Sequence, residues 1–209
     1  MFSAETLHFL TDLRSNNSRD WFQANRARYD AHVAGAAQGF GDALAAELQR
    51  LAGRPVTPKL FRLHRDLRFS KDKTPYNAHV HMSFSAGGPF AWLVGIDPGG
   101  LVLGYGALGF DAALLGRWRQ AVDGPGGPAL GAELTRLVAL GHRLSAPELK
   151  RVPAPYPAGH PQADLLRRKS FAIWQDQHPM AMAYGPGAPA RLAQALQVWE
   201  PLRGLLAAV

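Results

Sequence analysis

The stretch that decides the fold reads Phe61-Arg-Leu-His-Arg-Asp-Leu-Arg-Phe69. Apolar and charged residues alternate along most of it, which is the period of a half-buried β-strand. Before Gly53 the apolar residues recur instead at helical spacing. We therefore predict an α+β fold in which helices precede and pack on an antiparallel sheet.

Two helices are predicted before this strand. Ser3 is a suitable N-cap for the first helix, which is expected to end at Asn16-Asn17. Ser18 is a suitable N-cap for a longer helix that runs to about Leu51. The two together predict a helical hairpin over residues 3–52.

Further strands are predicted after the first one. They are expected at residues 79–85, 90–97 and 101–106, because the turn signals Gly87-Gly-Pro89 and Asp97-Pro-Gly-Gly100 separate apolar runs. Short links between consecutive strands favour antiparallel pairing. The sheet is therefore expected to hold about four to five strands over residues 59–106, with residues 170–174 as a candidate extra strand.

The rest of the chain, residues 110–209, is predicted to consist of helices and loops. Helices are expected at about residues 111–122, 129–140, 164–168 and 189–206, and a proline-rich ordered loop at residues 152–161. At 209 residues the whole chain, 1–209, is expected to form a single domain.

Composition excludes several classes of site. The chain contains no cysteine, which rules out disulfides, a thiol nucleophile, cysteine-bound zinc and iron–sulfur clusters. The N-terminal residues do not have the pattern of a secretory signal, and no apolar run approaches the roughly 18 residues of a membrane span. A cytoplasmic protein without membrane contact is therefore expected.

The basic charge is concentrated in one place. The net charge is +7, and the segment from Lys59 to Lys73 holds six basic and two acidic residues. More than half of the excess positive charge therefore lies in the first strand and the turn that follows it. Such a cluster indicates an anionic partner.

Strand alternation would place Arg62, His64, Asp66 and Arg68 on one face, and an antiparallel return would add His79 and His81 to it. Arg65 instead falls in phase with the apolar residues, where an unpaired guanidinium is costly. Arg65 is therefore expected either to form a structural ion pair or to contact a ligand, and the sequence favours neither alternative. Candidate structural partners are Asp12, Asp20 and Glu47.

This constellation suits an anion, because arginine forks match phosphate or carboxylate oxygens and lysine adds a mobile charge. The candidate ligand-binding residues are Arg62, His64, Arg65, Arg68, Lys71, Asp72, Lys73 and His81. Tyr76 is the candidate acid, and Asp66 and His79 are candidates to orient groups or move protons. The alternative is a charged, solvated hairpin without a ligand.

A metal site is a weaker hypothesis. His79 and His81 occupy alternate strand positions and could share a metal with Asp66, Asp72 or His64. Adjacent arginine and lysine side chains oppose a dication, so neither a metal nor another cofactor is predicted. Gly104-x-Gly106-x-x-Gly109 matches a dinucleotide fingerprint only as a string, and we interpret it as a strand end that needs close backbone approach.

The central motif also resembles that of a known family. Arg62-x-x-Arg65-Asp66-x-Arg68-Phe69-x-x-Asp72-Lys73-x-x-Tyr76 is similar to the signature of the bacterial family called domain of unknown function 2461. Upstream and downstream features agree with this resemblance, namely Asn17, Trp21-Phe22, Tyr29, His160-Pro161 and Lys169-Ser-Phe171. The resemblance implies a bacterial protein of about this length and carries no activity.

The sequence thus supports two functional hypotheses and one structural alternative. The first is a protein that binds, and in one version turns over, a phosphorylated or otherwise anionic small molecule at this hairpin. The second is a nucleic-acid-binding protein that uses the same basic face. The structural alternative is a charged hairpin that docks a protein partner.

Overall fold

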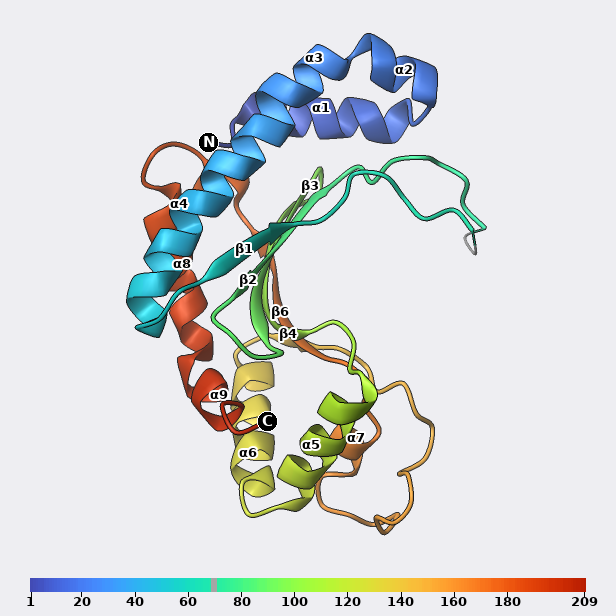
Figure 1. Ribbon diagram of the computed structural model, residues 1–209, viewed down its shortest axis with the longest axis vertical. Coiled ribbons are helices and arrows are strands. Elements are labelled where there is room, and N and C mark those ends of the chain that lie inside the picture. Colours follow the sequence, from blue (N-terminus) through green and yellow to red (C-terminus); the bar gives the residue numbers. More distant parts are fainter. Residues whose placement is uncertain (69–70) are drawn as a thin grey trace.

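A twisted antiparallel sheet lies at the centre of the computed structural model, which describes residues 1–68 and 71–209, with only the main chain described at residue 177 (Figure 1). Within these residues the sheet has six strands in the order β1-β2-β3-β4-β6-β5, and every neighbouring pair is antiparallel. The strands are β1 (Thr57–Leu60), β2 (Val80–Ser85), β3 (Ala91–Asp97), β4 (Gly100–Ala107), β5 (Arg143–Leu144) and β6 (Phe171–His178). The α+β prediction is confirmed, with one strand more than expected, because the short β5 has no sequence pattern of its own.

Strand β2 shows the alternation of a half-buried strand. Val80, Met82 and Phe84 are buried, whereas His81 and Ser83 on the other face remain accessible. Phe84 pairs with Trp92 of β3, which pairs with Tyr105 of β4. This row of large rings forms part of the core on one face of the sheet.

Two N-terminal helical segments form the predicted hairpin. Helix α1 (Ala4–Ser15) ends at its C-cap Asn16, as expected. The expected second helix is interrupted at Asn25, where α2 (Arg19–Ala24) gives way to a long helix. That helix consists of α3 (Arg26–Tyr29), a π-helical turn η1 (Asp30–Ala34) and α4 (Gly35–Ala52).

Helices cover one face and one end of the sheet. Helix α4 packs along it together with α8 (Ala188–Leu196), while three helices gather at the other end of the molecule, α5 (Ala112–Asp123), α6 (Gly127–Ala139) and α7 (Ala163–Leu166) (Figure 1). The expected closing helix at residues 189–206 divides into α8, a 3-10 turn η3 (Gln197–Trp199) and α9 (Glu200–Leu205), and a second 3-10 turn η2 (Met180–Ala183) precedes α8. Among the helices of the described residues, none has both the length and the apolar character needed to cross a membrane.

The glycines of β4 allow close approach of β6, as interpreted from the sequence. A Cβ atom on Gly106, whose φ is +157°, would lie 2.0 Å from the carbonyl oxygen of Phe171. A Cβ atom on Gly104 would lie 2.5 Å from the indole ring of Trp174. Both positions therefore require the absence of a side chain.

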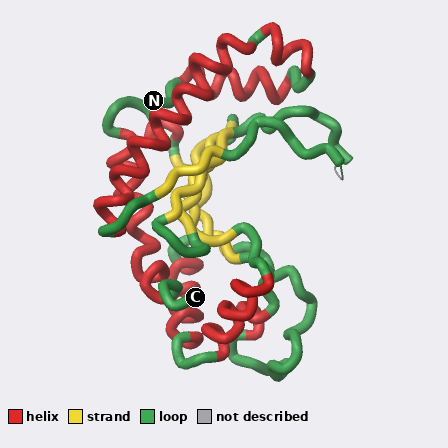
Figure 2. The backbone as a smooth tube through the Cα atoms, in the orientation of Figure 1, coloured by secondary structure: helices red, strands yellow, loops and turns green. Residues whose placement is uncertain are grey.

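The segment that suggested the first strand is not a strand. Strand β1 ends at Leu60, and residues 61–68 and 71–79, called the arm below, form the two limbs of an irregular hairpin that reaches away from the sheet (Figures 1 and 2). The expected antiparallel return is confirmed, because Asn77 donates its N–H to the carbonyl of Leu63 at 2.7 Å and Arg65 donates to that of Pro75 at 3.0 Å. Pro75 has no N–H with which to continue the ladder. Phe69 and Ser70, which belonged to the predicted strand and its connection, lie outside the described residues.

Candidate functional site

A cleft of about 380 Å³ lies where the arm passes the end of α1. Its walls carry Arg14 and Asn17 from the helix end, and Arg65, Thr74 and His79 from the arm. The cleft therefore exists only because two segments far apart in the sequence meet there. Its lining includes two guanidinium groups, one imidazole and the carboxylate of Asp72.

Asn17 attaches the arm to the helical hairpin. Its Nδ2 donates to the carbonyl oxygen of Tyr76 at 2.8 Å, and its Oδ1 accepts from the N–H of Tyr76 at 3.0 Å. The ring of Tyr76 is buried and stacks on Phe22 with 4.4 Å between ring centroids. One side chain thus satisfies both backbone groups of a residue that is also packed into the core.

Arg65 is held in the cleft by its own arm. Its guanidinium donates to the carboxylate of Asp72 and to the hydroxyl of Thr74, and Asp72 also accepts from the N–H of Thr74 at 2.9 Å. These contacts, first of all that with Arg65, lower the pKa of Asp72 to about 2. The ion pair therefore persists at every physiological pH.

The structure corrects the expected partners of Arg65. Asp12 pairs with Arg28 at 2.9 Å and Glu47 with Arg50 at 2.8 Å. The arm folds back on itself and places Asp72 next to Arg65, whereas the carboxylates of Asp12 and Glu47 pair with arginines of the helical hairpin. The alternation of residues along one strand could not predict this ion pair, because Asp72 lies on the part of the arm that returns toward the sheet.

His79 and His81 lie next to each other, as the sequence predicted. Their rings stack with 3.9 Å between centroids. The ring of His81 rests on Gly95, where a Cβ atom would lie 3.2 Å from His81 Cδ2. The absence of a side chain at Gly95 therefore provides the space for this pair.

Burial, together with the charges of His81, Arg14 and Arg65, lowers the pKa of His79 to about 4. Burial also lowers the pKa of His81, although Asp97 opposes the change. His79 is thus neutral at neutral pH. Burial is the main cause of its lowered pKa, and the positive charges of Arg14 and Arg65 add a smaller contribution that a bound anion would offset.

Acidification is expected to destabilise the protein between about pH 6.5 and pH 4. In the unfolded chain His79 takes up a proton near 6.5, but in the fold only near 4, so stability is complete above this range and is lost as the pH falls through it. Asp72 does not contribute here, because its share of stability is lost only below its unfolded pKa of 3.8. The measurement is the unfolding midpoint of wild type and His79→Gln as a function of pH.

The His79→Gln variant is expected to show a flatter pH profile than wild type. His8→Gln is the matched control, since that side chain is 66% exposed on α1. The control should keep the wild-type slope. If stability changed equally with pH in all three proteins, the pKa of His79 would not be lowered in the folded protein.

The other predicted site residues lie outside the cleft. Asp66 and Arg68 form an exposed ion pair at 2.6 Å, and their mutual hydrogen bonds lower the pKa of Asp66 and raise that of Arg68. Lys73 donates to the carbonyl of Leu67 at 3.0 Å. Further along the arm, Lys71 is exposed, Arg62 contributes its carbonyl to Asn77, and the ring of His64 meets the ring of Tyr76 at 5.1 Å between centroids.

The sequence placed Arg62, Asp66 and Arg68 on the same face as His79, and Arg65 on the opposite face. That prediction is wrong. Arg65 lines the same cleft as His79, whereas Arg62, Asp66 and Arg68 do not. Strict alternation holds only where a ladder of hydrogen bonds keeps the strand extended, and in the described residues of the arm that ladder is interrupted at Pro75. The burial of the Tyr76 ring favours a packing role for this residue over that of an acid.

Arg14, Asn17 and Thr74 were not predicted as site residues. Arg14 lies in the last turn of α1, and within the described residues it has no hydrogen bond or ion pair. Asn17 had two signals, its place at a helix end and its agreement with the family resemblance, and neither indicated a contact with the arm. Nothing local in the sequence indicates that a helix end will meet an arm that begins more than 40 residues later.

Within the described residues, no group of three or more His, Cys, Asp or Glu side chains is placed to hold a metal ion. The two histidine rings stack face to face. That arrangement directs the rings at each other rather than at a shared point.

Comparison with models of protein families gives a match. A family model described as "Conserved hypothetical protein (DUF2461)" matches residues 5–204, which is nearly the whole chain. No curated protein matches.

Proposed function

The chain belongs to the DUF2461 family, whose description names no activity, and from the geometry of the arm cleft we propose that it binds a phosphorylated or otherwise anionic small molecule there. The observation that carries the proposal is the convergence of Arg14 and Arg65 on the neutral side chain of His79. Arg14 attracts the oxygens of an anion with a charge that no ion pair among the described residues offsets, and Arg65, although paired with Asp72, faces the same small space.

The two arginines support different parts of this function. Arg65 is positioned in advance by Asp72 and Thr74, so little side-chain freedom is lost when an anion binds. Arg14 carries a full charge with no ion-pair partner among the described residues. The cleft therefore combines one fixed and one adaptable donor.

The exposed basic residues of the arm act at longer range. Arg62, Lys71 and Lys73 are exposed on the same arm and do not line the cleft. Exposed charges of one sign raise the rate at which an anion is captured, and salt screens them. His79 is neutral at neutral pH and would serve as a base for turnover of the ligand if the negative charge of a bound anion raised its lowered pKa.

Removing either cleft arginine is expected to weaken anion binding about tenfold or more, since a charge-assisted hydrogen bond contributes about 1.5–3 kcal/mol. The variants are Arg14→Ala and Arg65→Ala, and the probes are inorganic phosphate, pyrophosphate and a sugar phosphate. Isothermal titration at low salt measures the dissociation constants. The wild-type protein is expected to bind at least one of the three.

Arg62→Ala and Arg68→Ala are the matched controls, because each removes one positive charge from the same arm outside the cleft. They should change affinity less than threefold. Equal losses in all four variants would show that the anions respond to the overall charge of the arm, which would contradict a defined cleft.

A nucleic acid is the second candidate ligand, and one observation favours it. Phe61 is 37% exposed at the base of the arm, with the ammonium group of Lys59 5.3 Å from its ring centroid. An exposed ring beside basic residues is a stacking surface for a base. This function predicts affinity for single-stranded oligonucleotides that falls steeply with salt and depends on Phe61 as well as on Arg62 and Arg68.

A further inference from the structure

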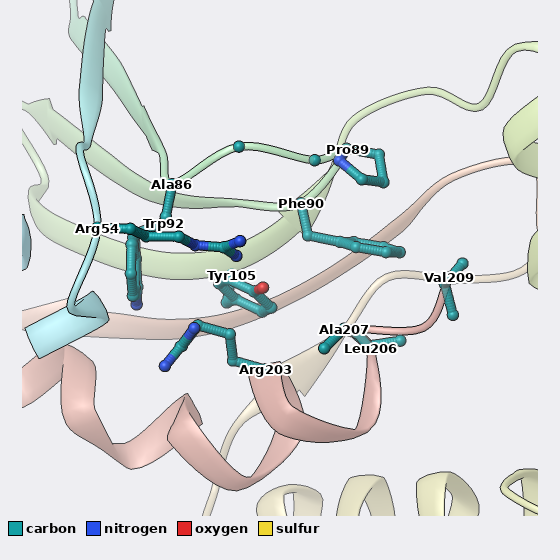
Figure 3. A pocket seen from close by; sticks show the side chains of 12 residues that line it. Arg54, Ala86, Pro89, Phe90, Trp92, Tyr105, Arg203, Leu206, Ala207 and Val209 are labelled. Atoms are coloured by element: carbon teal, nitrogen blue, oxygen red, sulfur yellow. The ribbon is translucent and has the colours of Figure 1, made fainter.

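A second cavity lies at the opposite end of β2 from the arm cleft. Its volume is about 320 Å³, and it is enclosed by the β2–β3 turn, the segment after α4 and helix α9 (Figure 3). His79 precedes β2 and Ala86 follows it. At a rise of about 3.3 Å per residue the two sites are separated by roughly 20 Å.

Three aromatic rings form one wall of this cavity. Phe90 and Tyr105 are nearly parallel, with 6.4 Å between centroids and 29° between planes, and Trp92 meets Tyr105 at 6.0 Å and 61°. Figure 3 shows these side chains around a common space. A planar ring placed among them would gain aromatic contacts of about 0.5–1.5 kcal/mol beyond the burial of its surface.

Two arginines flank the aromatic wall. Arg203 projects from α9, donates to the carboxylate of Glu200 at 2.8 Å and stands over the ring of Trp92 at 5.9 Å. Arg54 enters from the segment after α4 and forms no hydrogen bond or ion pair with any residue that the structure describes. With one guanidinium neutralised by Glu200, the cavity retains a single positive charge.

Tyr105 adds a neutral donor. Burial raises the pKa of its phenol well above the usual range, so the hydroxyl stays protonated at any physiological pH. Figure 3 shows its oxygen within the space between Phe90 and α9. At the mouth Gly87 and Gly88, both with positive φ, carry no side chains that would close the opening.

We infer that this cavity is a binding site for a planar aromatic or heteroaromatic monocarboxylate, whose ring lies against Phe90, Trp92 and Tyr105 and whose carboxylate meets Arg54. One available positive charge matches a monoanion rather than a phosphate dianion. The aromatic wall favours a ligand with an apolar planar face, because a strongly hydrated group placed against it would lose hydration that the rings do not replace. The site shares no lining residue with the arm cleft.

The test uses indole-3-acetate, benzoate and the uncharged indole-3-acetamide as probes, with binding to the full chain measured by isothermal titration. Wild type is expected to bind at least one carboxylate at least tenfold more tightly than the amide. Arg54→Ala should remove that preference by weakening the carboxylate only. Tyr105→Phe should weaken the carboxylate severalfold while the aromatic wall is retained.

Arg50→Ala is the matched control, since Arg50 is an exposed arginine of α4 outside the cavity that pairs with Glu47 at 2.8 Å. It should bind like wild type, as should Arg65→Ala in the arm cleft. The inference is overturned if no aromatic carboxylate binds at millimolar concentration, or if Arg54→Ala retains the preference for carboxylate over amide. Arg54 is exposed after the end of α4, so its replacement leaves the core intact.

Discussion

The Asn17→Ala variant is expected to lose about 2 kcal/mol of unfolding free energy and most of its affinity for anions. The substitution leaves the N–H and the carbonyl of Tyr76 without their partners in a buried setting, and each unsatisfied group costs about 1–3 kcal/mol. It also releases the arm from the end of α1, which separates Arg65 from Arg14. Urea denaturation and titration with pyrophosphate measure the two losses.

Asn16→Ala provides the control for this prediction. Asn16 is the neighbouring residue, and its side chain donates only to the carbonyl of Asp12 at 2.9 Å, within its own helix end. The Asn16→Ala variant is expected to lose less than about 1 kcal/mol of unfolding free energy and to bind anions like wild type. If Asn17→Ala were no more harmful than Asn16→Ala, the attachment of the arm would not depend on this side chain.

The Gly106→Ala variant is expected to lose about 4 kcal/mol, the largest loss of stability among these substitutions. Alanine is strained at a φ of +157°, and its Cβ would lie 2.0 Å from the carbonyl oxygen of Phe171, so β4 and β6 would have to separate. Tyr105 precedes this residue on β4, and its ring would lose its place in the aromatic cavity. Urea denaturation gives the loss of stability.

Gly109→Ala is the matched control, because a Cβ atom there would find no atom within 4 Å. It should change stability by no more than about 0.5 kcal/mol. A Gly106→Ala protein as stable as the control would mean that β6 lies further from β4 than the structure shows.

The two proposed sites differ in how they are built. The aromatic cavity rests on residues of β3 and β4, which the sheet holds rigidly. The arm cleft rests on a hairpin attached through Asn17, Tyr76 and a few backbone hydrogen bonds. A ligand in the arm cleft is therefore expected to stabilise the arm itself, whereas a ligand in the cavity would find its site already formed.

Much of the fold followed from local pattern. The turns at Gly87-Gly-Pro89 and Asp97-Pro-Gly-Gly100 predicted the strands that became β2, β3 and β4. The N-caps Ser3 and Ser18 marked the starts of α1 and α2 correctly. These features succeed because a turn or a cap is decided by a few neighbouring residues.

The arm shows where local pattern fails. Its alternation predicted a strand, but a strand also needs a partner ladder, and the pairing of the arm with itself is interrupted at Pro75. The order of β6 between β4 and β5, and the break of the second helix at Asn25, likewise had no signal in the sequence. Each depends on contacts between distant segments.

The sequence by itself determined the fold class, most of the elements and the concentration of basic charge between Lys59 and Lys73. It also placed His79 beside His81, because alternate residues of one strand face the same way. Only the tertiary structure decided that Arg65, not Arg62 or Arg68, meets His79, and that Arg14 and Asn17 complete the cleft. The reason is physical: spacing along a chain specifies which way neighbouring side chains point, whereas the position of a helix end against a returning arm depends on the packing of the whole molecule.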